Sequence, residues 1–392
     1  MIEPEKIIYL DNNATTRPDP VVIEEMLPFL TKYYGNPSSG YAFGSQVREA
    51  IECARGRVAG LLGCQPTEIV FTSGGTESNN AAINSALQLD ADRQHIVTTA
   101  VEHSAIYRHC EQLARRGCAV TFLEVDSDGH LDLDELESAV RPETAIISAM
   151  WANNETGVLF PVRQIAEIAR RKRVFFHTDA VQAAGKIPIR FSESAINFAS
   201  VSGHKLHGPK GVGALYVSRH STFRPTILGG EQENKRRAGT ENVASIIGFG
   251  KAAECAAAAV QEQERRVRLL RDRFESGVLA NVPGARVNGD RTERLPNTSS
   301  LSFDGIESEA ALILLDRHGI CCSAGSACRA GSRDASHVLR AMGLTDESTR
   351  NSLRFSFGRF NTEAEVERAL EIVPKVIAKL RALSTSSLAT IQ

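Results

Sequence analysis

The chain has 392 residues, of which 42% are hydrophobic and 23% charged, and its net charge is −2. This composition is ordinary for a globular protein, and the near-neutral charge argues against a nucleic-acid partner. The eight cysteines form no CxxC pair and no Cys/His spacing typical of zinc sites, which favours free thiols in a reducing cytoplasm and no resident metal. No apolar run approaches the roughly 20 residues of a membrane span, so we expect no membrane association.

Strand and helix patterns alternate between about residues 67 and 217, after a short first strand at 7–10. Such alternation predicts an α/β domain with a mostly parallel central sheet and helices on both faces. The predicted strands are 68–71, 95–99, 119–125, 144–151, 174–178, 196–201 and 213–217, and the predicted helices are 76–89, 104–116, 132–140 and 162–171.

The composition changes near residue 245. A long alanine-rich helix is predicted at 252–280, followed by strands at 298–303 and 352–357 and helices at 308–318 and 362–383. This order is typical of a smaller α+β domain. We therefore expect a large domain at 16–250 and a small domain made of 1–15 and 251–392, with a frayed tail at 384–392.

A glycine-containing turn, Thr72-Ser73-Gly74-Gly75-Thr76, joins a predicted strand to a predicted helix. The exposed N–H groups and the partial positive charge of a helix N-terminus suit a phosphate group. A plain glycine turn with a threonine cap would have the same pattern. The turn is neither a P-loop nor a dinucleotide-binding fingerprint, so it implies no nucleotide.

Two polar side chains follow predicted strands. Asp179 could hold a protonated ring nitrogen at the ligand-binding edge of the sheet, although a strand-end aspartate is more often a helix cap. Lys205 lies in a glycine-rich turn, where desolvation lowers a lysine pKa and favours the neutral amine that attacks a carbonyl. Lys210, in a Pro-Lys-Gly sequence, is the competing lysine and is expected to be exposed. An ordinary surface position stays open for both.

The segment at 323–332 contains almost no bulky side chain and is predicted to be a mobile loop. Cys328 lies at its centre beside Arg329, where exposure and a neighbouring cation favour the thiolate. The remaining cysteines are expected to be buried and unreactive: Cys53, Cys64, Cys110, Cys118, Cys255, Cys321 and Cys322.

The order of these motifs resembles the cysteine desulfurases, which are class-V aminotransferase-like enzymes of the fold-type I pyridoxal-phosphate group. The resemblance covers essentially the whole chain. It also rests on Tyr9-Leu10-Asp11-Asn12-Asn13-Ala14-Thr15-Thr16, Gly35-Asn36-Pro37-Ser38-Ser39, Arg237-Ala238-Gly239-Thr240-Glu241-Asn242 and Arg354-Phe355-Ser356. The runs at 151–157 and 177–182 look closer to the NifS-type branch than to the IscS type. Arg329-Ala330 departs from the small hydroxyl residues common in the family, which bears on the choice of sulfur acceptor.

The resemblance implies a pyridoxal 5'-phosphate bound covalently to Lys205 in a homodimer. The phosphate would be held by Gly75, Thr76, Ser202 and His204, and by Thr240 reaching across from the other subunit. His103 would stack on the ring and move protons, Asp179 would pair with the ring nitrogen and Gln182 with the ring hydroxyl. Asn154 would contact cofactor and substrate, and Arg354 would bind the substrate carboxylate, which a guanidinium can grip at two points.

The implied activity converts L-cysteine to L-alanine and leaves the sulfur as a persulfide on Cys328. The expected acceptor is an iron–sulfur scaffold protein, with a transient [2Fe–2S] cluster shared through Cys328, while tRNA thiolation and cofactor sulfuration stay open. The alternative enzymes are a selenocysteine or cysteine lyase and an aminotransferase of the same fold, and the non-enzymatic alternative is a sulfur-trafficking scaffold. Cys328 argues against an aminotransferase, and Lys205, His103 and Asp179 argue against a scaffold.

Overall fold

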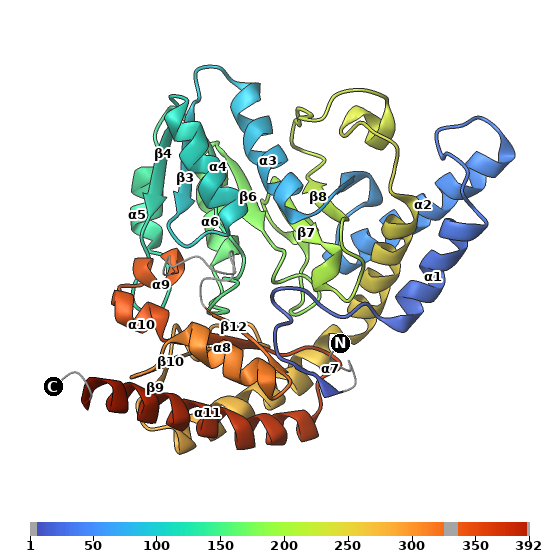
Figure 1. Cartoon of the computed structure of the whole chain (residues 1–392). Coiled ribbons are helices and arrows are strands. Elements are labelled where there is room, and N and C mark those ends of the chain that lie inside the picture. Colours follow the sequence, from blue (N-terminus) through green and yellow to red (C-terminus); the bar gives the residue numbers. More distant parts are fainter. Residues whose placement is uncertain (1–5, 325–335, 390–392) are drawn as a thin grey trace.

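A computed structural model describes residues 6–324 and 336–389 of the chain, with the backbone alone described at 384–389. Figure 1 shows two layered bodies, one above the other in this view. The upper body is built on a seven-stranded sheet, and the lower body on a four-stranded sheet with helices packed against it. The long helix α7 (Val243–Asn281) packs against helices of both bodies.

The seven-stranded sheet has the order β2-β8-β7-β6-β5-β3-β4. Its pairs are parallel except those of β8, which runs antiparallel to both of its neighbours. The strands are β2 (Ile69–Thr72), β3 (His95–Thr99), β4 (Ala119–Leu123), β5 (Thr144–Ser148), β6 (Phe175–Asp179), β7 (Phe198–Ser202) and β8 (Gly213–Val217). Every residue of β2, β3, β5, β7 and β8 is buried, which explains why these strands read as short apolar runs without alternation. The predicted mostly parallel sheet is confirmed.

Helices cover both faces of this sheet, and each face has its own hydrophobic cluster. The helices α3 (Gly75–Leu89) and α4 (Ser104–Arg115) cover one face. The other face is covered by α1 (Pro20–Thr31), α2 (Ala42–Leu62), α5 (Leu133–Ala139), α6 (Val162–Lys172) and the first part of α7. Short 3-10 turns lie at Pro66–Glu68, Phe191–Glu193, Gly203–Lys205 and Gln232–Lys235.

The four-stranded sheet is antiparallel, with the order β12-β13-β10-β9. Its strands are β9 (Ala285–Val287), β10 (Thr298–Phe303), β12 (Ser323–Ala324) and β13 (Ser352–Ser356), while β1 (Ile8–Tyr9) pairs in parallel with β11 (Ile320–Cys321). The helices of this region are α8 (Ser308–Arg317), α9 (His337–Ala341), α10 (Asp346–Arg350) and α11 (Glu363–Ala389). A separate hydrophobic cluster joins β1, β10, β13, α8, α11 and the second part of α7.

Most predicted elements agree with the structure to within a few residues, but two predictions need correction and two helices were not predicted. Helix α7 begins at Val243, nine residues earlier than predicted. Helix α11 continues to Ala389, so the prediction of a frayed tail is wrong for 384–389. The sequence analysis does not predict α1 and α2, because a proline at position 28 interrupts the first and three glycines interrupt the second.

The prediction that no stretch is apolar enough to cross a membrane is also corrected. By length and composition α7 passes that test, and 44% of its apolar window is buried in the structure. It packs against α1, α2 and α11. A core helix of a globular protein passes the same test, so packing accounts for the apolar composition of α7.

The cysteines are less buried than predicted. Cys110 is buried, as expected, but Cys53 is exposed, and the other five described cysteines are half-buried: Cys64, Cys118, Cys255, Cys321 and Cys322. Burial raises the pKa of Cys64 to about 12, which keeps that thiol protonated at neutral pH.

A buried ion pair fixes the long segment between β8 and α7. Both terminal nitrogens of Arg55 on α2 donate to the carboxylate of Glu233, at 2.7 and 2.8 Å. The same carboxylate accepts from the backbone N–H of Phe71 on β2, and the Arg55 guanidinium also lies 4.7 Å from the centre of the Phe71 ring. Glu233 lies seven residues before Thr240, so this pair holds the Thr240 segment against the sheet.

We expect Glu233→Ala to lower the free energy of unfolding by about 3–5 kcal/mol, because it removes the buried counter-ion of the Arg55 guanidinium. The partners that remain for Arg55 are the exposed carboxylate of Glu52 and the Ile69 carbonyl oxygen. Chemical denaturation followed by circular dichroism measures this loss. The control is Glu371→Ala, which breaks an ion pair with Arg368 whose side chains are both 59% exposed and should cost less than about 1 kcal/mol. Equal losses in the two variants would show that the Arg55–Glu233 pair does not anchor the segment.

Candidate active site

A cavity of about 230 Å³ lies at the carboxyl ends of the parallel strands. In a sheet of this kind the ligand binds at that edge. The cavity is lined by Ala14, Gly75, Thr76, Asn79, His103, Met150, Ala152, Asn154, Asp179, Val181, Gln182, Ser202, His204 and Lys205. Nine residues that the sequence analysis singled out therefore line one cavity: Gly75, Thr76, His103, Asn154, Asp179, Gln182, Ser202, His204 and Lys205.

One end of the cavity is the N-terminus of α3. Gly74 precedes the helix with a φ of 151°, and no described side chain caps the helix start, so its first N–H groups are open to a ligand. A Cβ atom on Gly75 would lie 2.7 Å from a methyl carbon of Val181, so the turn can approach β6 this closely only with glycine there. Uncapped N–H groups at a helix start beside Ser202 form an anion site.

Asp179 ends β6 inside the cavity and is 6% exposed. One of its carboxylate oxygens accepts from the side-chain amide of Asn79 at 2.7 Å, and the other from the backbone N–H of Val181 at 3.0 Å. These two contacts fix the carboxylate. The amide oxygens of Asn79 and Asn154, which also line the cavity, are buried without a hydrogen-bond partner in the described part of the chain.

Lys205 ends the 3-10 turn that directly follows β7. Its ammonium donates to the backbone carbonyl oxygens of Asn13 and Ala14, the second at 2.7 Å. Lys210 is exposed, as the sequence analysis predicts. Of the two candidate lysines, Lys205 alone lines the cavity.

The side chains of Gln182 and Lys186 both donate hydrogen bonds to Asn13. The Gln182 amide donates to the backbone oxygen of Asn13 at 2.9 Å, and Lys186 donates to the side-chain oxygens of Asn13 and Gln182 at 2.9 and 2.7 Å. Burial holds the pKa of Lys186 well below its usual range, and the nearby charges of Lys205 and Arg354 act in the same direction. Neither Lys186 nor Asn13 is among the predicted site residues. Asn13 belongs to the family motif at 9–16, and Lys186 is marked only by its position four residues after Gln182.

His103 precedes α4, and its ring nitrogen Nδ1 accepts from the backbone N–H of Ala105 at 3.1 Å. Burial lowers the His103 pKa, while the Asp179 carboxylate acts in the opposite direction. The preceding residue, Glu102, is fully buried and accepts from the Thr99 hydroxyl and the Met150 N–H, both at 2.8 Å. Burial raises the Glu102 pKa to about 8, so its carboxyl group is mostly protonated at neutral pH.

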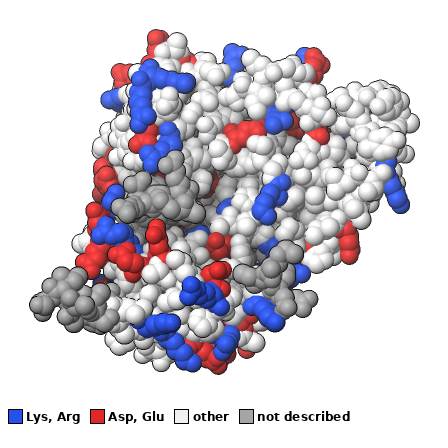
Figure 2. All heavy atoms as spheres, in the orientation of Figure 1, with Lys and Arg blue, Asp and Glu red and all other residues white. Residues whose placement is uncertain are grey.

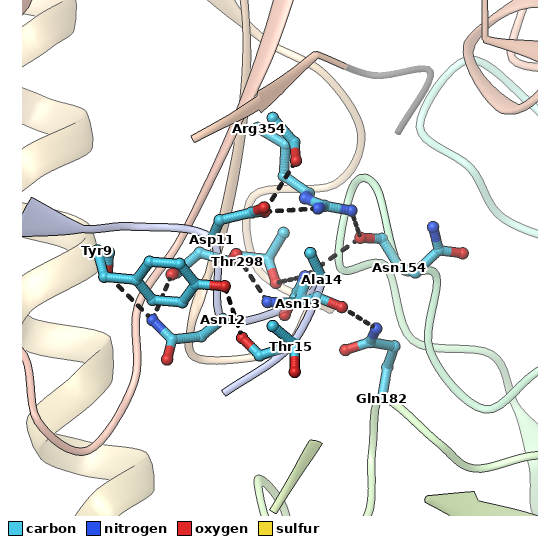
Figure 3. A network of polar contacts seen from close by, with 12 residues as sticks. Tyr9, Asp11, Asn12, Asn13, Ala14, Thr15, Asn154, Gln182, Thr298 and Arg354 are labelled. Atoms are coloured by element: carbon cyan, nitrogen blue, oxygen red, sulfur yellow. Dashed lines mark hydrogen bonds and ion pairs between the residues drawn. The ribbon is translucent and has the colours of Figure 1, made fainter. Parts of the chain in front are cut away.

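Arg354 on β13 approaches the cavity from the small sheet. Figure 3 shows its guanidinium between Asp11 and the backbone of Asn154. Nη2 donates to the Asp11 carboxylate at 2.7 Å, and Nη1 donates to the Asn154 carbonyl oxygen at 3.0 Å. Arg354 is 2% exposed. It is therefore a buried cation held at a backbone carbonyl of a cavity residue.

One sequence-predicted site residue lies away from the cavity, and another is not described. Thr240 is exposed and lines a different pocket of its own chain, together with Ser73, Gly211 and Arg237. Cys328 lies outside the described residues. The described residues on either side of it bond to groups near the cavity: Ser323 donates to Asp11 at 2.9 Å, and Ser336 donates to the buried carboxylate of Glu155 at 2.6 Å.

The cavity fits a planar ring that carries a phosphate. The open helix N-terminus and Ser202 suit the phosphate, the fixed carboxylate of Asp179 suits a protonated ring nitrogen, and Lys205 supplies an amine. The side-chain oxygens of Asn79 and Asn154 have no partner among the described residues, so both can accept a hydrogen bond from a ligand. Such a lining fits pyridoxal phosphate.

Known proteins resemble this chain over nearly its whole length. The model of the aminotransferase class-V family matches residues 8–369. A cysteine desulfurase of Nostoc sp. is 52% identical over 378 residues, which cover 96% of this chain and 94% of that protein. The cysteine desulfurase NifS of Azotobacter vinelandii is 50% identical, with the same coverage of each chain.

Solved structures agree with the sequence relatives. A NifS-like protein superposes with a TM-score of 0.90 at 37% identity, covering 95% of this chain and 100% of that one. The NifS-like protein of Rickettsia africae superposes with a TM-score of 0.86 at 33% identity, covering 95% and 99%. Together with the class-V match and the lining of the cavity, these relatives show that the chain belongs to the cysteine desulfurases, pyridoxal-phosphate-dependent enzymes of the aminotransferase class-V family.

Proposed function

We propose that this cysteine desulfurase binds its cofactor covalently through Lys205 and collects the substrate's sulfur as a persulfide on Cys328. The observation that carries the proposal is the convergence of Lys205, His103 and Asp179 on one cavity at the edge of the sheet. When bound there, pyridoxal phosphate supplies an aldehyde and a ring that withdraws electrons from the substrate's α-carbon.

The phosphate is held by Gly75, Thr76, Ser202 and His204. Burial lowers the His204 pKa to about 4, and nearby lysines act in the same direction, so its ring is neutral and can donate one hydrogen bond. Asp179 holds the ring nitrogen, and Gln182, whose amide is oriented by Asn13 and Lys186, faces the ring hydroxyl. His103 stacks on the ring.

Arg354 binds the substrate carboxylate, and Asn154 contacts both substrate and cofactor. Lys205 takes the α-proton. The lowered pKa of His103 keeps its ring neutral at rest, so His103 can accept a proton and then pass it on. The Cys328 thiolate then attacks the substrate sulfur: the new S–S bond forms as the substrate's C–S bond breaks. The balance is L-cysteine plus thiol giving L-alanine plus persulfide.

The covalent chain limits how far Cys328 can lie from the cavity. Cys328 is five residues after Ser323, and five residues span at most about 18 Å. Ser323 bonds to Asp11, which pairs with Arg354 at the substrate end of the site. The reach of the chain thus supports Cys328 as the sulfur acceptor.

A homodimer is supported by the surface around α1. Large apolar side chains are exposed on α1 and just after it, including Ile23 at 52%, Leu30 at 65% and Tyr34 at 78%. Figure 2 shows that the end of the molecule formed by α1 and α2, at the right of the view, carries few charged side chains. An exposed apolar surface of this kind is typical of a protein interface. Thr240, which does not line the cavity of its own chain, would complete the phosphate site of the second subunit.

A persulfide is a sulfur donor, so we also propose a downstream acceptor. An iron–sulfur scaffold protein that takes sulfur from Cys328 is the proposed partner, and the two would share a transient [2Fe–2S] cluster.

The seven cysteines in the described part of the chain are free thiols, which supports a reducing compartment, the cytoplasm. We also propose the division into a large domain at 16–250 and a small domain at 1–15 and 251–392, supported by the separate clusters of the two sheets.

Cys328→Ser should separate cofactor binding from sulfur transfer. The hydroxyl is nearly the size of the thiol, but it is not an anion at neutral pH and cannot hold a persulfide. The variant should bind the cofactor and still change its visible spectrum when cysteine is added, while alanine formation and transferable sulfur fall to background. Amino-acid analysis and mass spectrometry measure the two products.

Cys321→Ser and Cys322→Ser are the matched controls for Cys328→Ser, and both should retain most of the turnover. Burial raises the pKa of both thiols, so neither is expected to be the nucleophile. Near wild-type alanine formation by Cys328→Ser, or extra sulfur mapped to Cys321 or Cys322, would replace the Cys328 mechanism with a direct lyase reaction.

A mixed dimer tests whether each site uses residues of both subunits. Lys205→Ala and Thr240→Ala are each expected to impair the enzyme alone. In the mixed dimer one site carries both defects and the other neither, so activity should recover toward half of the wild-type value. Differently tagged subunits, purified as the mixed species, provide the measurement. An absence of recovery in the confirmed mixed dimer would contradict a shared site.

A further inference from the structure

The three donor positions of Arg354 have unequal partners. Nη1 donates to the Asn154 carbonyl oxygen and Nη2 to the Asp11 carboxylate, but Nε is buried and has no acceptor among the described residues. A polar group that is buried without a partner is costly and usually marks the place of a ligand or water. Since Arg354 is 2% exposed, the open Nε is a strong sign that an anion binds here.

The guanidinium also needs a counter-ion when no substrate is bound, because an unpaired buried charge costs several kcal/mol. Two acids lie near enough to interact. Glu155 is buried, and its carboxyl group accepts a hydrogen bond from Ser336. Burial raises the Glu155 pKa to about 7, so a large fraction of this carboxyl group is protonated at neutral pH. Asp11 makes the direct contact at 2.7 Å and is therefore the resident counter-ion.

Asp11 is fixed from both sides. Its backbone forms an isolated bridge with Ser356 on β13, two residues after Arg354, and the N–H of Asn12 donates to the Ser356 carbonyl oxygen at 3.1 Å. Its carboxylate also accepts from the hydroxyl of Ser323 on β12 at 2.9 Å. The carboxylate thus has a set place beside Nη2, and Figure 3 shows this arrangement.

Nε and Nη2 together form one edge of the guanidinium, the edge that grips a carboxylate at two points. A substrate carboxylate on this edge takes the open Nε and must displace or share the Nη2 contact of Asp11. We propose that Asp11 is a positioning residue for Arg354, which holds the guanidinium between turnovers and yields Nη2 to the α-carboxylate of the substrate. The inference rests on the proposed carboxylate-binding role of Arg354.

Asp11 then has two opposing effects on carboxylate binding. Its hydrogen bond orients Arg354, which strengthens binding, while its negative charge repels the incoming carboxylate, which weakens it. Asparagine keeps the acceptor oxygen and removes the charge. Alanine removes both. The two substitutions should therefore change affinity in opposite directions, which a residue with only a structural role would not do.

The test uses the full-length holoenzyme and 3-mercaptopropionate, which is cysteine without its amine and cannot react with an aldehyde as an amine does. Calorimetry measures its Kd, and steady-state kinetics measure KM and kcat for cysteine. Asp11→Asn should lower the Kd about fivefold, and Asp11→Ala should raise it about tenfold. In both variants the KM for cysteine should change by a larger factor than the kcat.

The control is Asp19→Asn. Asp19 also pairs with an arginine, Arg359 at 3.0 Å, and it caps α1, a position that asparagine fills equally well. This variant should leave the Kd within about twofold of the wild type. A Kd unchanged in Asp11→Asn, or a change of the same sign in both Asp11 variants, would overturn the inference.

Arg354→Lys separates this inference from the proposed function. If Arg354 binds the carboxylate, the lysine variant should lose about tenfold or more in affinity for 3-mercaptopropionate, since an ammonium cannot grip a carboxylate at two points. An unchanged Kd in Arg354→Lys would overturn the assignment of Arg354 itself. A large loss there, together with unchanged Asp11 variants, would overturn only the role of Asp11.

Discussion

The hydrogen bonds of Asn13 join the two halves of the active site. Its backbone oxygen accepts from Lys205 and Gln182, which belong to the seven-stranded sheet and its loops. Its side-chain amide donates to Thr298 on β10 at 2.8 Å, and its backbone N–H donates to the Ser356 hydroxyl on β13 at 2.9 Å. Asn13 is 1% exposed, so water cannot replace these bonds. Asn13 thus links Lys205 to the small sheet that carries Arg354.

The same neighbourhood concentrates positive charge. Burial lowers the pKa of Lys186, and the nearby charges of Lys205 and Arg354 act in the same direction. Asp179 and Asp11 are the carboxylates that line or border this region, and each is tied to a fixed partner. A site with this balance attracts a phosphate and a carboxylate, which are the anionic groups of the cofactor and of an amino-acid substrate.

Much of this arrangement could be predicted from the sequence, and the reasons are local. Short apolar runs predict buried parallel strands, and polar residues directly after such runs, such as Asp179 and Lys205, must lie at the ligand edge of the sheet. The roles of Asn13, Asp11 and Lys186 could not be predicted in this way. Asn13 and Asp11 bond to residues more than 100 positions away, and Lys186 differs from a surface lysine only through neighbours that folding supplies.

We expect Lys205, held at the Asn13 carbonyl, to be the lysine that carries the cofactor, although Lys186 donates to the side chain of the same asparagine. Borohydride reduction of the purified holoenzyme fixes the cofactor to the lysine that carries it, and peptide mapping by mass spectrometry then identifies that lysine. A single label on Lys205 is expected. A label on Lys186 or on the exposed Lys210 would contradict it.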